Sequence, residues 1–308
     1  MRLLMLSYQA DRTMVQFYPD LFFPSLRSTR FLRRWPFVAL LFRLARHVEL
    51  VVHEAPYEAL RRAPGMRGRV ARALWRRLIT LPTAAFVHTE WERRELTRTL
   101  GLAPEQIGLL EHGRSFVKRT RLESAQARRE LGIDEKAFCF LCIGFLQHHK
   151  GFDRAIRAFN QVRGDHLRLD IVGSARVPAP EIEAYVGELR DLARCSPRVT
   201  LHEQFVSDEL FDRWLEACDA VVLPYRVIWS SGVLARATLF SKSVIVSHVG
   251  GLPEQAGPAA RVVHDDVGLS IAMAELAGVR LQPASGGRGT QPAGVAQPGS
   301  PPAPIRPE

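Results

Sequence analysis

The sequence predicts an α/β protein whose second half forms a doubly wound parallel sheet. Short apolar runs alternate with helical patterns from residue 137 to residue 247 without a break, as expected of parallel strands joined by crossover helices. The 308 residues are 46% hydrophobic and 24% charged, an ordinary globular composition at a length that suits two domains. The stretch 279–308 is rich in Pro and Gly and poor in large apolar side chains, so we expect a disordered tail there.

The second half contains the clearest strands and helices. Ala137–Gly144 (AFCFLCIG) is a continuous apolar run that ends in Gly, which is typical of a buried parallel strand. Further strands are expected at Leu167–Gly173, Val199–Leu201, Ala220–Leu223 and Val244–Ser247, and helices at Lys150–Val162, Pro180–Cys195, Asp208–Cys218 and Gly232–Phe240. Ligands of such sheets bind beyond the carboxyl ends of the strands. We therefore expect the loops that follow these strands to form the site.

The first half is less regular. Strands are expected at Arg2–Ser7, Thr13–Phe17, Val48–His53 and Ala84–His88. Between residues 31 and 44, four large apolar side chains repeat at spacings of four, three and four and so share one helical face: Phe31, Trp35, Val38 and Phe42. That face is either the core side of a domain helix or a membrane-docking face flanked by the arginines of the same segment.

The net charge of +10 is confined to the first hundred residues, which carry 18 Arg and 8 acidic residues. Such an imbalance favours an anionic partner, such as lipid headgroups or a phosphorylated acceptor, or it reflects a coding bias toward Arg. No nucleic-acid partner is expected, because no aromatic-basic recognition module accompanies the charge. No apolar run approaches the ~20 residues of a spanning helix. We therefore expect a cytoplasmic protein, with peripheral contact to the inner face of a membrane as an extension of that interpretation.

The four cysteines do not form a disulfide framework. Cys139 and Cys142 form a C-x-x-C within an apolar strand. Because a redox or zinc site needs exposed thiols or a second pair, we expect these two side chains to pack in the core.

Three loops after the expected strands have features of phosphate binding. Lys150 stands beside Gly151 just before a helix, where its point charge adds to unpaired helix N–H groups. Ser230-Ser231-Gly232-Val233 opens a second helix with hydroxyls and a glycine that permit close approach of an anion. The turn at Gly250-Gly251 leads to the carboxylate of Glu254. Each feature alone is common on protein surfaces, but together one lysine and two helix N-termini suit a diphosphate.

These motifs, in this order, resemble those of a known family. The segments GFLQHHKGFDRAIRAF, LRLDIVGS, VTLHEQFVSDEL, CDAVVLPY, SSGVLARA and SVIVSHVGGLPE are similar to the nucleotide-sugar domain of the family 4 retaining glycosyltransferases, the glycosyl transferases group 1. VELVVHEAPY, AAFVHTEWERREL and IGLLEHG look like the later part of the family's N-terminal domain. The resemblance implies the GT-B fold of two Rossmann-like doubly wound domains. These would be an incomplete acceptor-side domain at 1–115 and a nucleotide-sugar domain at 116–278, followed by the tail at 279–308.

The resemblance also implies site roles. His53 would lie by the donor sugar and acceptor, Lys150 on the diphosphate, and Glu254 near the sugar, and these three would be the catalytic residues. Donor binding is implied for Gly144, Lys150, Gly173, Val206, Ser207, Asp208, Ser230, Ser231, Gly232, Val233 and Arg236. His112-Gly113 matches the turn that leads into the second domain.

The activity that the resemblance implies is that of a hexosyltransferase. A hexose would pass from a nucleoside diphosphate sugar to a glycan or lipid-linked acceptor with retention, as in polysaccharide biosynthesis. The donor is a substrate, no cofactor is implied, and no metal is required because lysine and helix N-termini supply positive charge. The chain has Phe145 where an Arg is common in the family, and Ile228 and Arg236 where two glutamates are common. The alternative is a catalytically impaired or truncated glycosyltransferase-like protein that only binds a nucleotide or a partner.

Overall fold

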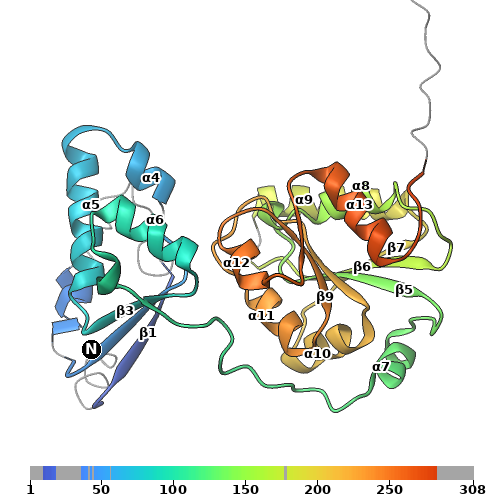
Figure 1. Ribbon diagram of the computed structural model, residues 1–308, viewed down its shortest axis with the longest axis horizontal. Helices are drawn as coiled ribbons and strands as arrows, with labels where there is room; N and C mark the ends of the chain where they lie inside the picture. Colours follow the sequence, from blue (N-terminus) through green and yellow to red (C-terminus); the bar gives the residue numbers. More distant parts are fainter. Residues whose placement is uncertain are drawn as a thin grey trace, which may run out of the picture.

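The structure is a computed structural model that describes residues 10–18, 36–40, 42–43, 45–55, 57–176 and 179–282. It contains two α/β domains, each built on an all-parallel sheet (Figure 1). The expected strand at Arg2–Ser7, residues 31–35 of the expected first helix, and residues 283–308 of the expected tail lie outside the described residues.

The first domain has a four-stranded parallel sheet in the order β1-β2-β3-β4. Its strands are β1 (Thr13–Phe17), β2 (Val48–Val52), β3 (Ala84–Val87) and β4 (Gly108–Leu109), and its helices include α4 (Tyr57–Arg62), α5 (Gly65–Thr80) and α6 (Glu90–Leu100). A 3-10 turn, η1, covers Pro104–Gln106. The first three strands confirm the expected strands within their described ranges. The two-residue β4 was not predicted, because its Gly-Leu sequence has no strand pattern.

The described part of the amphipathic segment at 31–44 is helical at residues 36–40 and 42–43. Val38 and Phe42, two of the four residues on its predicted apolar face, are 3% and 4% exposed and belong to the core of the first domain. These two positions therefore act as core residues. Within the described ranges, no helix combines the length and the apolar character needed to cross a membrane.

The second domain has a six-stranded parallel sheet in the order β10-β9-β8-β5-β6-β7. Its strands are β5 (Phe138–Ile143), β6 (Leu167–Gly173), β7 (Val199–Glu203), β8 (Ala220–Leu223), β9 (Ser243–Ser247) and β10 (Arg261–Val263). Its helices are α7 (Ser124–Leu131), α8 (Phe152–Phe159), α9 (Pro180–Arg194), α10 (Asp208–Ala217), α11 (Gly232–Leu239), α12 (Leu252–Ala256) and α13 (Asp266–Leu276), with a 3-10 turn η2 at His148–Lys150. The strand order reverses direction between β5 and β8, which is the topological switch point where such sheets bind ligands.

The predicted doubly wound sheet is confirmed from β5 to β9. The buried faces also agree, since Phe152, Ile156 and Phe159 of α8 are fully buried. Cys139 and Cys142 are fully buried on β5, and burial raises the pKa of both thiols, as expected of core packing.

The last part of the second domain differs from the prediction. α12, β10 and α13 were not predicted, because they are short or built from small residues without a clear apolar period. The tail was expected to begin at residue 279, but residues 280–282 are paired with residues 161–163, which follow α8. Leu281 bridges Val162, and the backbone N–H of Gln282 donates to Gln161 O at 2.7 Å. The domain therefore extends at least to residue 282.

Two loops approach each other closely at the carboxyl ends of β5 and β6. A Cβ atom on Gly173 would lie 1.8 Å from the carbonyl oxygen of Gly144. Gly144 has a φ of +132°, which side chains rarely adopt. Both positions therefore require glycine, for space at Gly173 and for conformation at Gly144.

We expect Gly173→Ala to lower the unfolding free energy of the second domain by about 1–3 kcal/mol, because backbone must move to admit the methyl group. Urea unfolding followed by circular dichroism measures this. The matched control is Gly187→Ala on α9, where a Cβ would meet nothing within 4 Å. That change should raise stability by up to about 1 kcal/mol. Equal effects of the two substitutions would contradict the prediction.

Candidate functional site

Lys150 lies at the switch point of the second sheet. It ends η2, the 3-10 turn after β5, and its Nζ is 4.1 Å from the ring centroid of Tyr225, which follows β8. Gly151, next in the chain, has a φ of +65°, and a Cβ there would lie 2.1 Å from the oxygen of Pro224. The loop after β5 thus packs directly on the segment after β8. The ammonium of Lys150 stands at the sheet edge where the sequence predicts it.

The amino end of α11 lies beside the same loop. The Oγ of Ser231 accepts the Leu234 N–H at 3.2 Å and so caps the helix. The Ser231 backbone N–H donates to Gln255 Oε1, and Gln255 Nε2 donates to the Ser231 carbonyl, both at 2.8 Å. A Cβ on Gly144 would lie 3.7 Å from Val233 Cγ2. Two loops that were predicted to bind phosphate therefore meet at this helix start, where the first N–H groups have no carbonyl partner within the helix.

The residues predicted to hold the nucleotide base at 206–208 follow β7, the edge strand beyond β6. Ser207 caps α10, since its Oγ accepts the Leu210 N–H at 3.2 Å. Val206 is partly buried against the core of the domain. The carboxylate of Asp208 accepts from Arg236 Nη1 at 3.0 Å. The side chains of Ser207 and Asp208 are thus engaged within the protein. A ligand at this turn would therefore contact its backbone.

The structure does not support a role for Arg236 in neutralising phosphate. Its Nε lies 2.6 Å from Asp212 Oδ1, and Asp212 is fully buried. Its Nη1 is paired with Asp208, and its guanidinium lies 5.3 Å from the ring centroid of Phe211. With two carboxylates beside it, the charge of Arg236 is already balanced. The residue connects α11 to α10 instead.

Arg226 is a cation near Lys150 that the sequence analysis missed. It donates to both carboxylate oxygens of Asp153, at 2.7 and 2.6 Å, and to the carbonyl of His148 at 2.8 Å. Burial raises the pKa of Asp153, but hydrogen bonds from Arg226, Tyr185 and Arg157 outweigh it and lower the pKa to about 2. Arg226 thereby fixes the turn that carries Lys150. Its position in the loop after β8 was the signal that could have indicated this.

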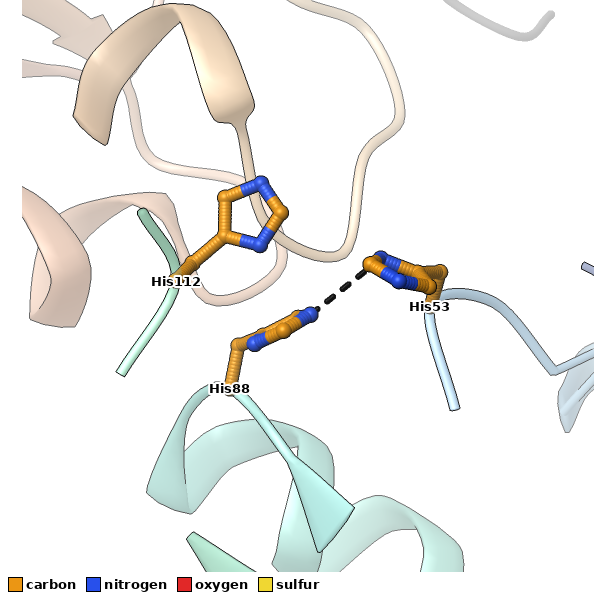
Figure 2. Close-up of side chains that lie close together, drawn as sticks. All are labelled: His53, His88 and His112. Atoms are coloured by element: carbon orange, nitrogen blue, oxygen red, sulfur yellow. Dashed lines mark hydrogen bonds between the residues drawn. The ribbon is translucent and has the colours of Figure 1, made fainter. Parts of the chain in front are cut away.

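Three histidines from the first domain and its exit gather at the domain boundary (Figure 2). His53 follows β2, His88 follows β3, and His112 comes shortly after β4, so the carboxyl ends of three adjacent parallel strands bring them together. His88 Nε2 lies 3.2 Å from His53 Nδ1, and the ring centroids of His88 and His112 are 4.1 Å apart. The sequence predicts His53 at this boundary, and it gives no pattern for a three-histidine cluster.

This cluster lies beside the candidate phosphate site. A Cβ on Gly232, the first residue of α11, would lie 3.2 Å from His112 Nε2. Burial lowers the pKa of His53 to about 4, with a smaller contribution from His88, and lowers the pKa of His112 to about 3. Burial also lowers the pKa of His88, against a hydrogen bond to the Leu110 carbonyl. All three imidazoles are therefore neutral near pH 7.

Glu254 makes a contact between the domains. Its carboxylate accepts hydrogen bonds from the backbone N–H groups of Glu90 and Trp91, the latter at 3.0 Å, at the start of α6. The indole of Trp91 packs edge-on against Trp229, with ring centroids 6.1 Å apart. The sequence predicts Glu254 near the sugar. That role stays a prediction, and it would require the carboxylate to exchange these N–H groups for sugar hydroxyls.

Thr89 and Glu92 complete the boundary on the first domain. Thr89 and Glu92 form a capping box at the start of α6, and a Cβ on Gly251 would lie 2.5 Å from Thr89 Oγ1. Burial raises the pKa of Glu92 to about 7, although hydrogen bonds from the backbone of His88 and the side chain of Ser230 act in the opposite direction. The glycine turn after β9 therefore fits against the N-terminus of α6.

Two parallel α/β domains whose strand ends meet at one boundary define the GT-B class of fold. Solved structures agree. Anabaena HepE in complex with UDP and glucose superposes with a TM-score of 0.66 at 18% identity, over 88% of this chain and 70% of that chain. Sucrose-phosphate synthase from Thermosynechococcus elongatus gives 0.69 at 18% identity, over 90% of this chain and 67% of that chain. At these identities the likeness shows the fold, so the chain has the GT-B fold.

Sequence comparison finds a matching family model and two curated relatives. Residues 137–278 match the family model described as Glycosyl transferases group 1. D-inositol 3-phosphate glycosyltransferase 1 of Catenulispora acidiphila is 30% identical over 173 residues, 54% of this chain and 41% of that protein. D-inositol 3-phosphate glycosyltransferase of Thermomonospora curvata is 27% identical over 183 residues, with the same two shares. The chain thus matches 41% of the length of these curated relatives.

The three lowered histidine pKa values predict a pH dependence of stability. Between about pH 6.5 and pH 4, histidines in the unfolded chain bind protons that the folded cluster does not bind, so the unfolding free energy should decrease as pH falls through this window. His112→Gln removes one titrating group and should reduce that decrease. Urea unfolding at several pH values measures it, with His166→Gln on an exposed loop as the control. An identical pH slope for wild type and His112→Gln would contradict the prediction.

Proposed function

We propose that the protein transfers a hexose from a nucleoside diphosphate sugar to a glycan or lipid-linked acceptor with retention. One observation carries the proposal. In a glycosyl transferases group 1 segment, the ammonium of Lys150 and the amino end of α11 stand at the switch point of one sheet. A diphosphate is the ligand that matches two positive groups in this place.

The proposed chemistry follows from where charge develops. As the bond from the anomeric carbon to the diphosphate breaks, negative charge grows on the leaving phosphate oxygens. Lys150 and the first amides of α11, at Gly232 and Val233, would stabilise that charge more in the transition state than in the ground state. These groups belong to the protein, so the proposed transfer requires no metal or cofactor.

The donor would extend from this point in two directions. The close backbone approach at Gly144 and Gly173 and the turn at 206–208 would contact the nucleotide through main-chain atoms. On the other side, His53 reaches the boundary next to α11, and because burial keeps its imidazole neutral, it would act on the sugar through a hydrogen bond. The HepE structure holds UDP and glucose, so UDP-glucose is the first donor to test.

The acceptor side is the first domain. The curated relatives are D-inositol 3-phosphate glycosyltransferases, and a phosphorylated acceptor suits the excess of Arg in residues 1–100. We therefore include D-inositol 3-phosphate beside glycan and lipid-linked acceptors. The same positive charge supports a cytoplasmic location with peripheral contact to an anionic membrane.

Lys150→Met should lower the affinity for UDP-glucose by at least about tenfold, because a charge-assisted contact contributes about 1.5–3 kcal/mol. It should also lower the transfer rate by about a hundredfold or more. Isothermal titration measures the affinity, and release of the nucleoside diphosphate measures the rate. Lys136→Met is the matched control, since Lys136 is exposed before β5, and it should change neither.

The outcomes separate two functions. Failure of the folded protein to bind any UDP, GDP or ADP sugar would contradict the proposal. Donor binding without transfer to any acceptor would favour a protein that only binds nucleotide or a partner. The second function has one specific observation in its favour, because Arg236 stands where the family commonly has a glutamate and is paired with two aspartates.

A further inference from the structure

We propose that His53, His88 and His112 form a binding site for one divalent transition-metal ion of the zinc class. The three ligand nitrogens all lie within 4.8 Å of one another, and their rings are half-buried at the domain boundary. Figure 2 shows the three rings arranged around a common centre. The inference goes beyond the proposed glycosyl transfer and does not rest on it, because the ion is held by side chains alone.

His88 and His53 each use one ring nitrogen for a hydrogen bond outside the cluster. The other ring nitrogen, which faces the cluster, is then free of a proton and can bind a metal ion. His88 Nδ1 lies 2.8 Å from the Leu110 carbonyl oxygen, which can only accept, so Nδ1 carries the proton and Nε2 does not. His53 Nε2 faces Gln16 Oε1, and in the tautomer in which Nε2 donates to that oxygen, Nδ1 is unprotonated. Metal-binding histidines commonly donate their second N–H to a carbonyl or carboxylate in this way.

These two ring nitrogens lie 3.2 Å apart. A hydrogen bond between the two rings has this spacing, and so does a pair of nitrogens that bind one cation. In a tetrahedral zinc site with Zn–N bonds of about 2.0–2.1 Å, two ligand nitrogens are about 3.3–3.4 Å apart. The observed spacing is therefore close to that of a zinc-bound pair.

The third ring completes the site with little movement. His112 Nε2 lies beside Gly232, and Figure 2 shows the other ring nitrogen directed toward His53 and His88. An ion equidistant from the three nitrogens would lie about 2.5 Å from each at the largest spacing. Closing to about 2.1 Å needs a shift of about half an ångström.

The imidazole ligands determine which metal ion would bind. Imidazole favours Zn²⁺, Cu²⁺ and Ni²⁺ over Mg²⁺ and Ca²⁺, which prefer oxygen. Burial keeps the three rings neutral near pH 7, the form that binds metal. Tyr18 stacks on His53 at 4.4 Å between ring centroids and fixes its plane.

Three ligands leave a fourth position for water. If the proposed function holds, the ion would compete with the donor sugar for His53.

The test is a Zn²⁺ titration of the full chain, without an affinity tag, after chelator treatment and in a reductant that does not bind zinc. We expect one ion per chain, measured by calorimetry against a competing chelator and by native mass spectrometry. Co²⁺ should give the visible absorption of a tetrahedral site. No donor or acceptor is present, so failure of the proposed function would not affect this result.

Variants assign the ion to the cluster. His88→Ala, and separately His112→Ala, should weaken Zn²⁺ binding by at least about a hundredfold. Gln16→Leu, which removes only the outer hydrogen bond of His53, should weaken it by about 10- to 100-fold. The matched control is His264→Ala, because His264 stacks on His248 at 4.5 Å in the second domain, and it should leave the affinity unchanged.

Three results would overturn the inference. They are a folded wild-type chain that binds no Zn²⁺, an ion that is retained in both cluster variants, and an ion that is lost in His264→Ala. Circular dichroism and urea unfolding establish that each variant is folded. If His88→Ala does not fold, the comparison rests on Gln16→Leu, whose side chain is exposed at the end of β1, and retention of full affinity in that variant would then overturn the inference.

Discussion

The boundary between the two domains depends on the short helix α12. Its Glu254 caps the start of α6 in the first domain, while the neighbouring Gln255 exchanges two hydrogen bonds with Ser231 at the start of α11 in the second domain. One turn of helix therefore holds the amino ends of two longer helices. Glu254 satisfies N–H groups at the start of α6, and Gln255 fixes the start of α11, where the proposed anion would bind.

The glycines around α12 make this arrangement sterically feasible. Gly250 has a φ of +56°, and a Cβ there would lie 1.8 Å from the carbonyl oxygen of Ile228. Gly251 contacts Thr89 of the first domain in the same manner. The backbone of the turn thus touches both the segment after β8 and the N-terminus of α6. A side chain at either position would separate elements that the candidate site needs in contact.

The candidate phosphate site and the histidine cluster share the start of α11. The Gly144 loop approaches it from the second domain, and His112 approaches it as the chain leaves the first domain. A ligand bound at one place would therefore lie close to the other. The neutral state of the histidines follows from burial at this boundary, where Gly232 of the second domain lies near His112.

Much of the second domain could be predicted from sequence, because a parallel strand buried on both faces needs a continuous apolar run, such as Phe138–Ile143. The helices between the strands follow from their apolar period, and the place of Lys150 follows from its position after a strand. β4 and α13 could not be found in this way, since two residues or a run of small side chains carry no period. The role of Arg236 could not be found either, because its partners Asp208 and Asp212 lie on another helix.

The sequence by itself determined the order of strands and helices and which loops reach the ligand edge, since these depend on local hydrophobic patterns. Only the tertiary structure decided which side chains meet there, because His53, His88 and His112 come from three separate strand ends and become neighbours only when the sheet forms.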